Sequence, residues 1–354
     1  MIKLLIVDDS ALVRKLLGKI FSAEGDFELK FSNNGRDALQ VNAEFRPDVI
    51  TLDIHMPEMG GLECLDRIMI ERPCPVVMVS SLTAAGADAT FEALRRGAVD
   101  FVAKPVRAIS LGIDALGAEL VSKVRNAAAI RLRPSLRLRE RVRHNIGDVL
   151  KAAPPPRKAA ARAKGTSLVL VGTSTGGPPA LEALLAPLPA NFPWPILVAQ
   201  HMPSGFTGSL ASRLDRICKL RVAEVINSTL LQPGAVYIGR GDADITVVSG
   251  KDGLLAASVP ALAGYPWHPS TDRLVRTAMA ALGAGQLIGV LMTGMGNDGA
   301  QAMRDLRNAG GRTIAEAEST AIVWGMPGEL VRMGGAEFIL PLPEIAPLLA
   351  ELAA

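Results

Sequence analysis

The sequence predicts an α/β protein with two doubly wound parallel-sheet domains joined by a basic linker. In both halves of the chain, short apolar strand candidates alternate with helical stretches, and the strand candidates end in polar or glycine-rich turns. Between the halves lies a segment rich in arginine, alanine and proline, a composition that argues against a packed core. At 354 residues the chain is long enough for about two domains.

The bulk composition is typical of a folded soluble protein, with 49% hydrophobic and 21% charged residues. No apolar run approaches the ~20 residues of a membrane span, and Asp8 and Asp9 follow the N-terminus too closely for a signal peptide. We therefore expect a cytoplasmic protein without membrane insertion. The three cysteines are scattered and lack metal-ligand spacing, so we expect ordinary core or surface residues.

The formal net charge of +3 is unevenly distributed along the chain. Residues 121–164 hold 13 of the 38 Lys and Arg residues and 2 of the 35 acidic ones, which leaves 25 basic and 33 acidic residues elsewhere. We interpret this segment as a solvated tether between domains 1–120 and 165–354. Such a segment can also contact nucleic acid or an acidic protein surface. No aromatic residue or groove-reading helix accompanies it, so no nucleic-acid partner is expected.

Charged residues follow the expected strands of the N-terminal half. Parallel strands place their functional groups at their carboxyl ends, and Asp8, Asp9, Asp53 and Lys104 all fall there. Three carboxylates at one edge repel one another, and a hard divalent cation, typically Mg²⁺, relieves that repulsion and organises phosphate. The expected strands are 3–7, 49–52, 76–79 and 101–103, and the first expected helix is 11–24.

Four motifs carry a family resemblance over residues 1 to 105. They are Val7-Asp8-Asp9-Ser10, Leu52-Asp53-Ile54-His55-Met56-Pro57, Val79-Ser80-Ser81 and Phe101-Val102-Ala103-Lys104-Pro105. In this order they resemble the flavodoxin-like receiver domain of two-component response regulators. The resemblance implies that Asp53 accepts a phosphoryl group from a histidine kinase and that Asp8, Asp9 and Asp53 bind Mg²⁺. It also implies that Ser80 is the switch hydroxyl and that Lys104 contacts the phosphoryl group. A carboxylate nucleophile, a metal and a lysine suit phosphoryl transfer.

A candidate nucleophile lies in residues 168–177, Leu-Val-Leu-Val-Gly-Thr-Ser-Thr-Gly-Gly. This pattern predicts a buried strand that ends in a tight turn before a helix, with Ser174 exposed at the carboxyl edge of a sheet. A serine there, near the N–H groups of a helix start, suits acyl transfer. Alternatively, the glycines only permit close helix packing or cradle a phosphate. The segment lacks the full motifs of nucleotide-binding loops.

The best candidate for a general base is His201, because it follows a strand and reaches the same sheet edge as Ser174. Of the other histidines, His55 flanks Asp53, His144 lies in the linker, and His268 lies in a loop before a helix. The expected strands of this half continue with 196–199, 235–239 and 286–292, and the expected helices include 206–218 and 269–282.

The third candidate is Asp298, in the glycine-rich turn after the strand 286–292. Its carboxylate could orient the imidazole of His201, cap a helix that begins near Ala300, or do both. The chain order Ser, His, Asp differs from the orders of chymotrypsin, subtilisin and the α/β-hydrolases, so the Gly-x-Ser-x-Gly pattern alone does not establish an α/β-hydrolase.

These motifs together resemble the Rossmann-like catalytic domain of the chemotaxis protein-glutamate methylesterases across residues 165 to 345. The resemblance implies that Ser174 is the nucleophile, His201 the base and then the acid, and Asp298 the orienting carboxylate. Backbone N–H groups near Met295 and His201 are then oxyanion candidates. The matching segments are Gly172-Thr173-Ser174-Thr175-Gly176-Gly177, Gln200-His201-Met202-Pro203-Ser204-Gly205-Phe206-Thr207, Pro269-Ser270-Thr271-Asp272 and Thr293-Gly294-Met295-Gly296-Asn297-Asp298-Gly299.

The implied activity is demethylation of methyl-glutamate, with deamidation of certain glutamines, on the cytoplasmic helices of chemoreceptors, switched on by phosphorylation and without a cofactor for the ester chemistry. The chain departs from the family pattern at residues 238–244 and at His268, where Lys or Arg is common, and at Gly60, where receivers often carry Asp. We expect the first two departures to affect substrate contacts or domain docking, and the third to have little effect.

Three other functions stay open from the sequence. An esterase for a different ester is the nearest, and a non-catalytic signalling scaffold would keep the fold without needing Ser174. A DNA-binding response regulator would explain the basic linker, but the strands and glycine turns after the linker argue against it.

Overall fold

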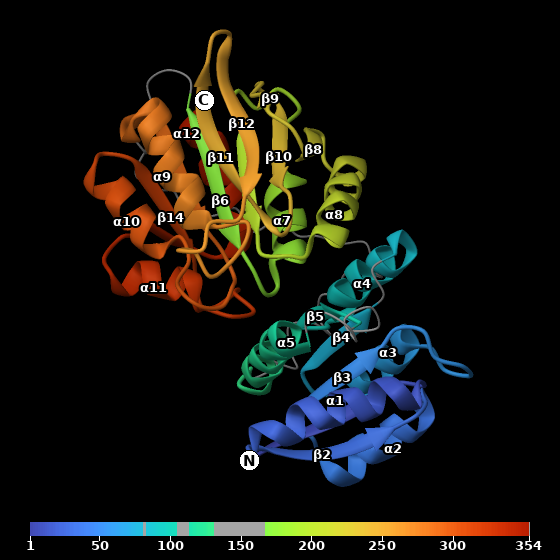
Figure 1. Ribbon diagram of the computed structural model, residues 1–354. Helices are drawn as coiled ribbons and strands as arrows, with labels where there is room; N and C mark the ends of the chain where they lie inside the picture. The colour runs from blue at the N-terminus through green and yellow to red at the C-terminus, as the bar shows by residue number, and fades with distance from the viewer. Residues whose placement is uncertain (81–82, 105–112, 131–166, 354) are drawn as a thin grey trace. The chain divides into compact units, whose positions relative to one another are not determined.

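The computed structural model describes residues 1–80, 83–104, 113–130 and 167–353 (Figure 1). The chain divides into two compact units, Met1–Lys158 and Ala159–Ala354. Most of the predicted linker, including His144, lies outside the described residues, as do Ser81 and Pro105 of the sequence motifs. Within the described ranges, no helix combines the length and the apolar character needed to cross a bilayer.

The first unit is a five-stranded sheet with the strand order β2-β1-β3-β4-β5, and each recorded strand pair is parallel. Helices α1 and α5 contact each other, as do α2 and α3, and α3 and α4, and the two groups cover opposite faces of the sheet (Figure 1). The strands are β1 Ile2–Val7, β2 Phe27–Ser32, β3 Val49–Asp53, β4 Val76–Ser80 and β5 Asp100–Ala103. The helices are α1 Ala11–Glu24, α2 Gly35–Phe45, α3 Gly61–Glu71, α4 Ala84–Arg96 and α5 Ile113–Ala128.

Helix α5 extends beyond residue 120, where the sequence predicted the end of the first domain, and ends at Ala128. Its apolar stripe is buried beyond that point, at Val121 and Val124. The Arg125 guanidinium donates to the carboxylates of Asp26 and Glu24, each at 2.8 Å. Lys123 and Arg125, which the sequence assigned to the basic linker, thus belong to a folded helix of the first unit.

The second unit contains a seven-stranded sheet with the order β15-β14-β13-β6-β7-β10-β8, and all its recorded strand pairs are parallel. A parallel sheet in each unit confirms the predicted fold class. A separate antiparallel sheet, β11-β12-β9, was not expected from the sequence. The strands are β6 Leu168–Thr173, β7 Ile196–Gln200, β8 Arg221–Val225, β9 Thr229–Leu230, β10 Ala235–Gly239, β11 Ala243–Gly250, β12 Gly253–Pro260, β13 Leu287–Leu291, β14 Arg312–Glu316 and β15 Phe338–Leu340.

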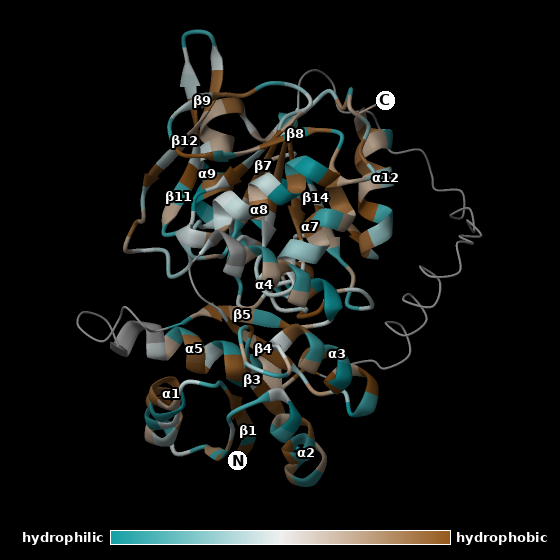
Figure 2. Ribbon diagram, turned by 90° about the vertical axis from the view of Figure 1, so that its right-hand side faces the viewer, coloured by the Kyte–Doolittle hydropathy of each residue, from teal (hydrophilic) through white to brown (hydrophobic). Residues whose placement is uncertain are grey.

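The central strands β6, β7 and β13 are buried along their whole length because helices cover both faces of the sheet. Contacts group α7 with α8 and α12, and α9 with α10 and β11. Figure 2 shows hydrophobic strands inside and hydrophilic segments on the outer faces of the helices. The helices are α7 Gly177–Leu185, α8 Ser204–Ile217, α9 Thr271–Leu282, α10 Ala300–Asn308, α11 Met326–Arg332 and α12 Leu342–Ala353, with a short 3₁₀ turn at Ala284–Gln286.

Candidate active site

The first cluster of functional side chains lies at the carboxyl ends of β1, β3 and β5. Carboxylate oxygens of Asp8, Asp9 and Asp53 lie within 4.8 Å of one another. Asp8 and Asp53 are fully buried, whereas Asp9 is exposed. The Lys104 ammonium lies 2.7 Å from Asp53 Oδ2 and 3.1 Å from Asp8 Oδ2. The structure thus gathers the four residues that the sequence placed at strand ends.

Charge in this cluster is only partly balanced. Burial raises the pKa of Asp53 and the neighbouring Asp8 carboxylate adds to the rise, while Lys104 offsets part of it. For Lys104, burial disfavours the charged form, but the two ion pairs outweigh it and raise its pKa. Three clustered carboxylates against one ammonium form an all-oxygen donor set, and this set fits a hard divalent cation.

Ser80 lies beside this cluster, at the end of β4. Its hydroxyl is buried and donates to the Gly86 carbonyl in helix α4 at 3.1 Å. The Ser80 carbonyl accepts the Lys104 N–H at 2.6 Å, so β4 and β5 are paired up to the lysine. The side chain predicted to act as a switch is therefore bonded to the first turn of α4, and its backbone carbonyl is bonded to Lys104.

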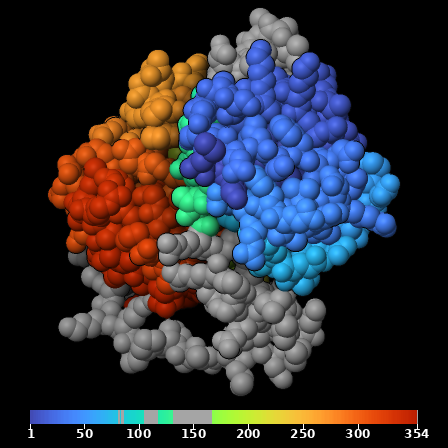
Figure 3. All heavy atoms as spheres, turned by 90° about the horizontal axis from the view of Figure 1, so that it is seen from below, coloured from blue at the N-terminus to red at the C-terminus, as the bar shows by residue number. Residues whose placement is uncertain are grey.

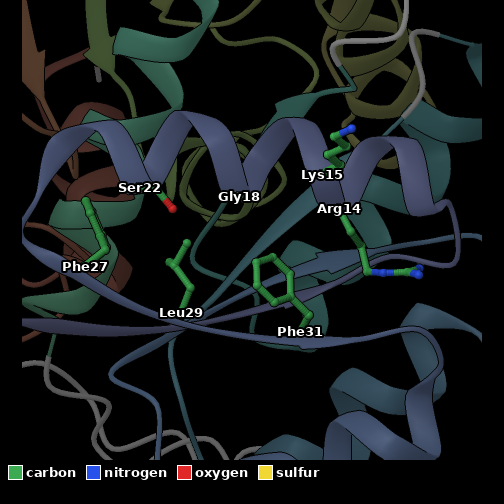
Figure 4. Close-up of a pocket in the computed structure, with 7 residues that line it drawn as sticks. All are labelled: Arg14, Lys15, Gly18, Ser22, Phe27, Leu29 and Phe31. Carbon is green, nitrogen blue, oxygen red and sulfur yellow. The ribbon is translucent and has the colours of Figure 1, made fainter.

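A surface groove between α1 and β2 is formed by a different set of residues (Figure 4). Arg14 connects it to the cluster, because its Nη1 donates to the carbonyls of Asp8 and Asp9 at 2.6 and 3.0 Å. Figure 3 shows the space-filling surface of the first unit, with its N-terminal residues in blue. The groove is lined by Arg14, Lys15, Gly18, Ser22, Phe27, Leu29 and Phe31.

The second cluster lies at the carboxyl ends of β6, β7 and β13. Thr173 pairs with Gln200, so Ser174 and His201 follow directly opposite residues on neighbouring strands. The Ser174 N–H donates to the Thr293 carbonyl at 3.0 Å and the His201 N–H to the Thr173 carbonyl at 3.1 Å. These bonds fix both residues at one edge of the sheet, as the sequence predicted.

Gln200 holds the backbone around the serine, a role that its place in the motif did not reveal. Its amide donates to the carbonyls of Ser174 and His201 at 2.9 and 3.0 Å. Helix α7 begins at Gly177, so close to this amide that an added Cβ would lie 1.9 Å from Gln200 Oε1. The glycine therefore permits close packing, one of the two alternatives to a nucleophile role, while leaving the serine half-buried.

The imidazole of His201 is bound to Asp298, with Nε2 and Oδ2 separated by 2.8 Å. Both side chains are nearly buried, at 9% and 3% exposure. Since a carboxylate accepts only, Nε2 carries the proton of this bond, and in the neutral imidazole Nδ1 then has the lone pair. Nδ1 is buried and has no hydrogen-bond partner within the part of the chain that the structure describes. The nitrogen available as a base is therefore Nδ1.

Asp298 also accepts bonds from the first residues of α9. These come from the Ser270 hydroxyl at 3.0 Å and from the backbone N–H groups of Thr271 and Asp272 at 2.6 and 3.1 Å. Burial alone would raise the pKa of Asp298, but these donors and His201 outweigh it and lower the pKa. The carboxylate is therefore ionised at neutral pH.

Asp298 does not cap the helix that the sequence predicted, the one that begins near Ala300. Helix α10 begins at Ala300 with Gly299 as its N-cap and without a side-chain cap bond. Asp298 serves α9 instead, which begins 27 residues earlier in the chain. Asp298 thus both binds the imidazole of His201 and caps a helix. No local sequence pattern around Asp298 could indicate that this helix is α9.

Met295 lies in the turn that follows β13 and is half-buried. The preceding Gly294 packs so closely on the serine that an added Cβ would lie 2.9 Å from Ser174 Cβ. The Gly294 carbonyl accepts the N–H groups of Gly325 and Met326, which fixes the turn. No bond from the Met295 N–H is recorded among the described residues, so this donor fits the predicted oxyanion role.

Two of the departures from the family pattern contact each other. The buried Asp244 carboxylate accepts bonds from His268 Nδ1 at 2.9 Å, the Ser270 N–H at 2.8 Å and the Arg273 guanidinium at 2.7 Å. Burial raises the pKa of Asp244, but these three donors outweigh it and lower the pKa. The cluster anchors the loop that leads into α9.

The fold and these side chains define a response regulator whose output unit has the architecture and side chains of a serine hydrolase. A receiver-domain family model matches residues 4–113 and a CheB methylesterase family model matches residues 169–349. The chain belongs to the CheB methylesterase family.

Relatives of this chain share its full length. A protein-glutamate methylesterase/protein-glutamine glutaminase of Rhodopseudomonas palustris is 55% identical over 99% of this chain and 98% of its own length. A second, from Rhodospirillum rubrum, is 48% identical over 98% of this chain and 95% of its own length. The crystal structure of the Thermotoga maritima CheB methylesterase catalytic domain covers 53% of this chain and 99% of its own, with a TM-score of 0.51 and 36% identity.

Proposed function

We propose that this chain is a protein-glutamate methylesterase, also active as a glutaminase, whose receiver unit activates it on phosphorylation. The observation that carries the proposal is the bond between His201 Nε2 and Asp298 at the strand end next to Ser174. Relatives that match this chain over nearly their full length bear this name. The Ser174 hydroxyl, the free Nδ1 of His201 and an ionised carboxylate together form the components of acyl transfer.

In the proposed reaction, the Ser174 oxygen attacks the methyl ester of a modified glutamate while His201 Nδ1 takes its proton. The Met295 N–H stabilises the negative charge on the ester oxygen. His201 gives the proton to the departing methoxide, which leaves as methanol. Water then attacks the acyl-enzyme with His201 as base, and His201 passes the proton to the Ser174 oxygen as the ester bond to serine breaks. The products are glutamate and the free serine. With a glutamine substrate, ammonia leaves instead of methanol.

The proposed switch lies in the first unit. Asp53 accepts the phosphoryl group, Lys104 contacts it, and Ser80 exchanges its bond to α4 for one to the phosphoryl oxygens. Asp8, Asp9 and Asp53 would hold Mg²⁺, which neutralises charge on the transferring group. The ester chemistry itself needs no cofactor in this scheme.

The proposed partners follow from the same assignment. The substrates are the cytoplasmic helices of chemoreceptors, and a chemotaxis histidine kinase supplies the phosphoryl group in the cytoplasm. The catalytic unit comprises residues 165–354, the receiver unit ends with α5, and the basic segment between them is a tether without a nucleic-acid partner.

The experiment is to measure methanol release from methylated chemoreceptor fragments, with and without acetyl phosphate and Mg²⁺. We expect release that rises with acetyl phosphate in the wild type and is absent in Ser174→Ala. Asp53→Asn should keep the basal rate and lose the rise. These two variants are matched controls because each removes one of the two chemistries.

The outcomes separate the alternatives. If the phosphorylated wild type releases no methanol but hydrolyses a small ester in a Ser174-dependent manner, the substrate is a different ester. Normal receptor binding without any Ser174-dependent chemistry would favour the signalling scaffold.

A further inference from the structure

The imidazole of His201 is held in position by few polar contacts. Its Nε2 binds Asp298, and its Nδ1 has no partner among the described residues. Besides this one hydrogen bond, no polar contact among the described residues restrains the torsion about the Cβ–Cγ bond of His201. The orientation of Nδ1 therefore depends on what packs against the ring. This orientation decides whether Nδ1 can accept the proton of the Ser174 hydroxyl.

Trp267 supplies that packing. The planes of its indole and of the His201 imidazole differ by only 6°, and the ring centroids are 6.1 Å apart. This is the separation of an offset aromatic stack, whose range is about 4.5–7 Å. With Asp298 at the edge and an indole parallel to the face, the plane of the imidazole is determined.

The same indole packs on the turn that carries the oxyanion candidate. A Cβ added at Gly296 would lie 2.9 Å from Trp267 Cζ2, and the φ of Gly296 is +76°. Both the close approach of the indole and the left-handed backbone at this position call for glycine. Gly296 directly follows Met295, so one side chain contacts both the base and the turn of the proposed oxyanion donor.

The loop that carries Trp267 is itself anchored. The next residue is His268, whose Nδ1 lies 2.9 Å from the buried Asp244 carboxylate. The Ser270 N–H donates to the same carboxylate at 2.8 Å. Because these bonds fix the backbone just after the indole, Trp267 can act as a rigid support.

We propose that Trp267 is a positioning residue for His201: its indole sets the plane of the imidazole and aligns the base with the Gly294–Asn297 turn. This inference rests on the proposed esterase function, since it gives the stack a role in the reaction. The stack itself can be tested without any ester.

The first test is the tryptophan fluorescence of the full chain at one fixed pH. Removing an imidazole that stacks on an indole changes the surroundings of that indole, so we expect the emission of His201→Gln to differ from that of the wild type. All three tryptophans and two of the four histidines, His201 and His268, belong to the second unit. Asp298 contacts His201, and Asp244 and Arg273 flank His268.

The change in emission caused by His201→Gln should be absent in a Trp267→Phe background and should persist in a His268→Gln background. An emission that His201→Gln leaves unchanged, or a change that persists in the Trp267→Phe background, would overturn the proposal, because the stacked pair would then not be the source of the change. Thermal unfolding of each variant verifies that it is folded.

The second test is the rate at which a fluorophosphonate labels Ser174, which depends on the base but not on a receptor. We expect Trp267→Leu, which keeps apolar volume without an aromatic face, to slow labelling about tenfold, and Trp267→Phe to stay within about threefold of the wild type. Wild-type labelling by Trp267→Leu would refute the positioning role. If the wild type itself is not labelled, the proposed function fails, while the fluorescence test still decides whether the stack exists.

Discussion

The backbone N–H of Thr271 donates to the Asp298 carboxylate at 2.6 Å, which ties the partner of His201 to the first turn of helix α9. The first N–H groups of a helix lack partners within the helix, and a carboxylate at the positive end of the helix dipole satisfies them. Helix and imidazole thus share one anion, so a change at Asp298 affects stability and chemistry together.

Replacing Asp298 with asparagine should separate these two roles. The amide oxygen can still accept one N–H from α9, so we expect a loss of only about 1 kcal/mol in the free energy of unfolding. An amide cannot hold the imidazolium by charge, so turnover should fall about 10³-fold or more. Urea unfolding and ester hydrolysis on the same preparation measure both effects.

The matched control is Asp305→Asn. Asp305 is partly exposed and pairs with Arg276 at 3.4 Å on the surface, so its loss should change unfolding by less than about 1 kcal/mol and leave turnover intact. Near-wild-type turnover in Asp298→Asn would show that the carboxylate charge does not serve the reaction.

Gly172 is the second position where fold and site meet. A Cβ added there would lie 2.4 Å from Thr271 Cγ2 and 2.8 Å from Leu291 Cδ1, in the interior between β6, β13 and α9. Gly172→Ala should therefore push α9 away from the sheet, lower the free energy of unfolding by about 1–3 kcal/mol and reduce activity, since α9 holds Asp298.

Gly264→Ala is the comparison, because a Cβ at Gly264 has no atom within 4 Å. Its unfolding midpoint in urea should match the wild type. Equal midpoints for the two alanine variants would mean that the contact between Gly172 and Thr271 is looser than the structure shows.

Much of the fold could be predicted because the central strands are short and wholly apolar. Strands such as β7 and β13 begin and end within one residue of the expected ranges 196–199 and 286–292. The edge strand β2 was missed, since its side chains are half-exposed and its pattern is mixed. The hairpin β11–β12 was missed because glycine and aspartate at residues 241–244 suggested only a changed loop.

The candidate site also has a part that the sequence could predict and a part that it could not. Asp8, Asp53 and Lys104 could be grouped from the sequence, because parallel strands bring their carboxyl ends together. The contacts of Asp298 with α9 and of Trp267 with His201 join segments far apart in the chain. No local pattern encodes such pairs, and only the packing of the helices on the sheet creates them.

Removal of divalent metal should separate the two chemistries of the chain. With EDTA present, we expect the basal Ser174-dependent hydrolysis to stay unchanged and the stimulation by acetyl phosphate to disappear, because among the described residues only the carboxylate cluster has a donor set for a hard cation. Added Mg²⁺ should restore the stimulation. In Asp9→Asn, we expect that restoring the stimulation by acetyl phosphate requires at least about tenfold more Mg²⁺ than in the wild type.

Measurements at fixed ionic strength provide the control for EDTA itself. Basal hydrolysis that falls with EDTA and returns with Mg²⁺ would contradict the assignment of the metal to the receiver unit alone.

Glu316 should make the stability of the protein depend on pH. Its carboxylate is fully buried at the end of β14 and accepts bonds from the Thr293 N–H at 2.8 Å and the Thr320 hydroxyl at 2.9 Å. Burial raises its pKa, and the two donors offset only part of the rise. Between the ordinary pKa of about 4.3 and the raised value, the folded state binds more protons than the unfolded state, so stability falls as the pH rises through that window.

Glu316→Gln removes this titration while keeping an oxygen for the Thr293 N–H. The free energy of unfolding of Glu316→Gln minus that of the wild type should therefore be smallest near pH 4.5 and increase as the pH rises through the window below the raised pKa of Glu316. Urea unfolding at several pH values between about 4.5 and 8 measures this difference. The matched control for the replacement of a carboxylate by an amide is Glu318→Gln, at an exposed position two residues away, measured under the same conditions. A Glu316→Gln advantage that is constant across this range would mean that the carboxyl group of Glu316 does not titrate with a raised pKa, and its effect on Thr293 would then be a matter of shape alone.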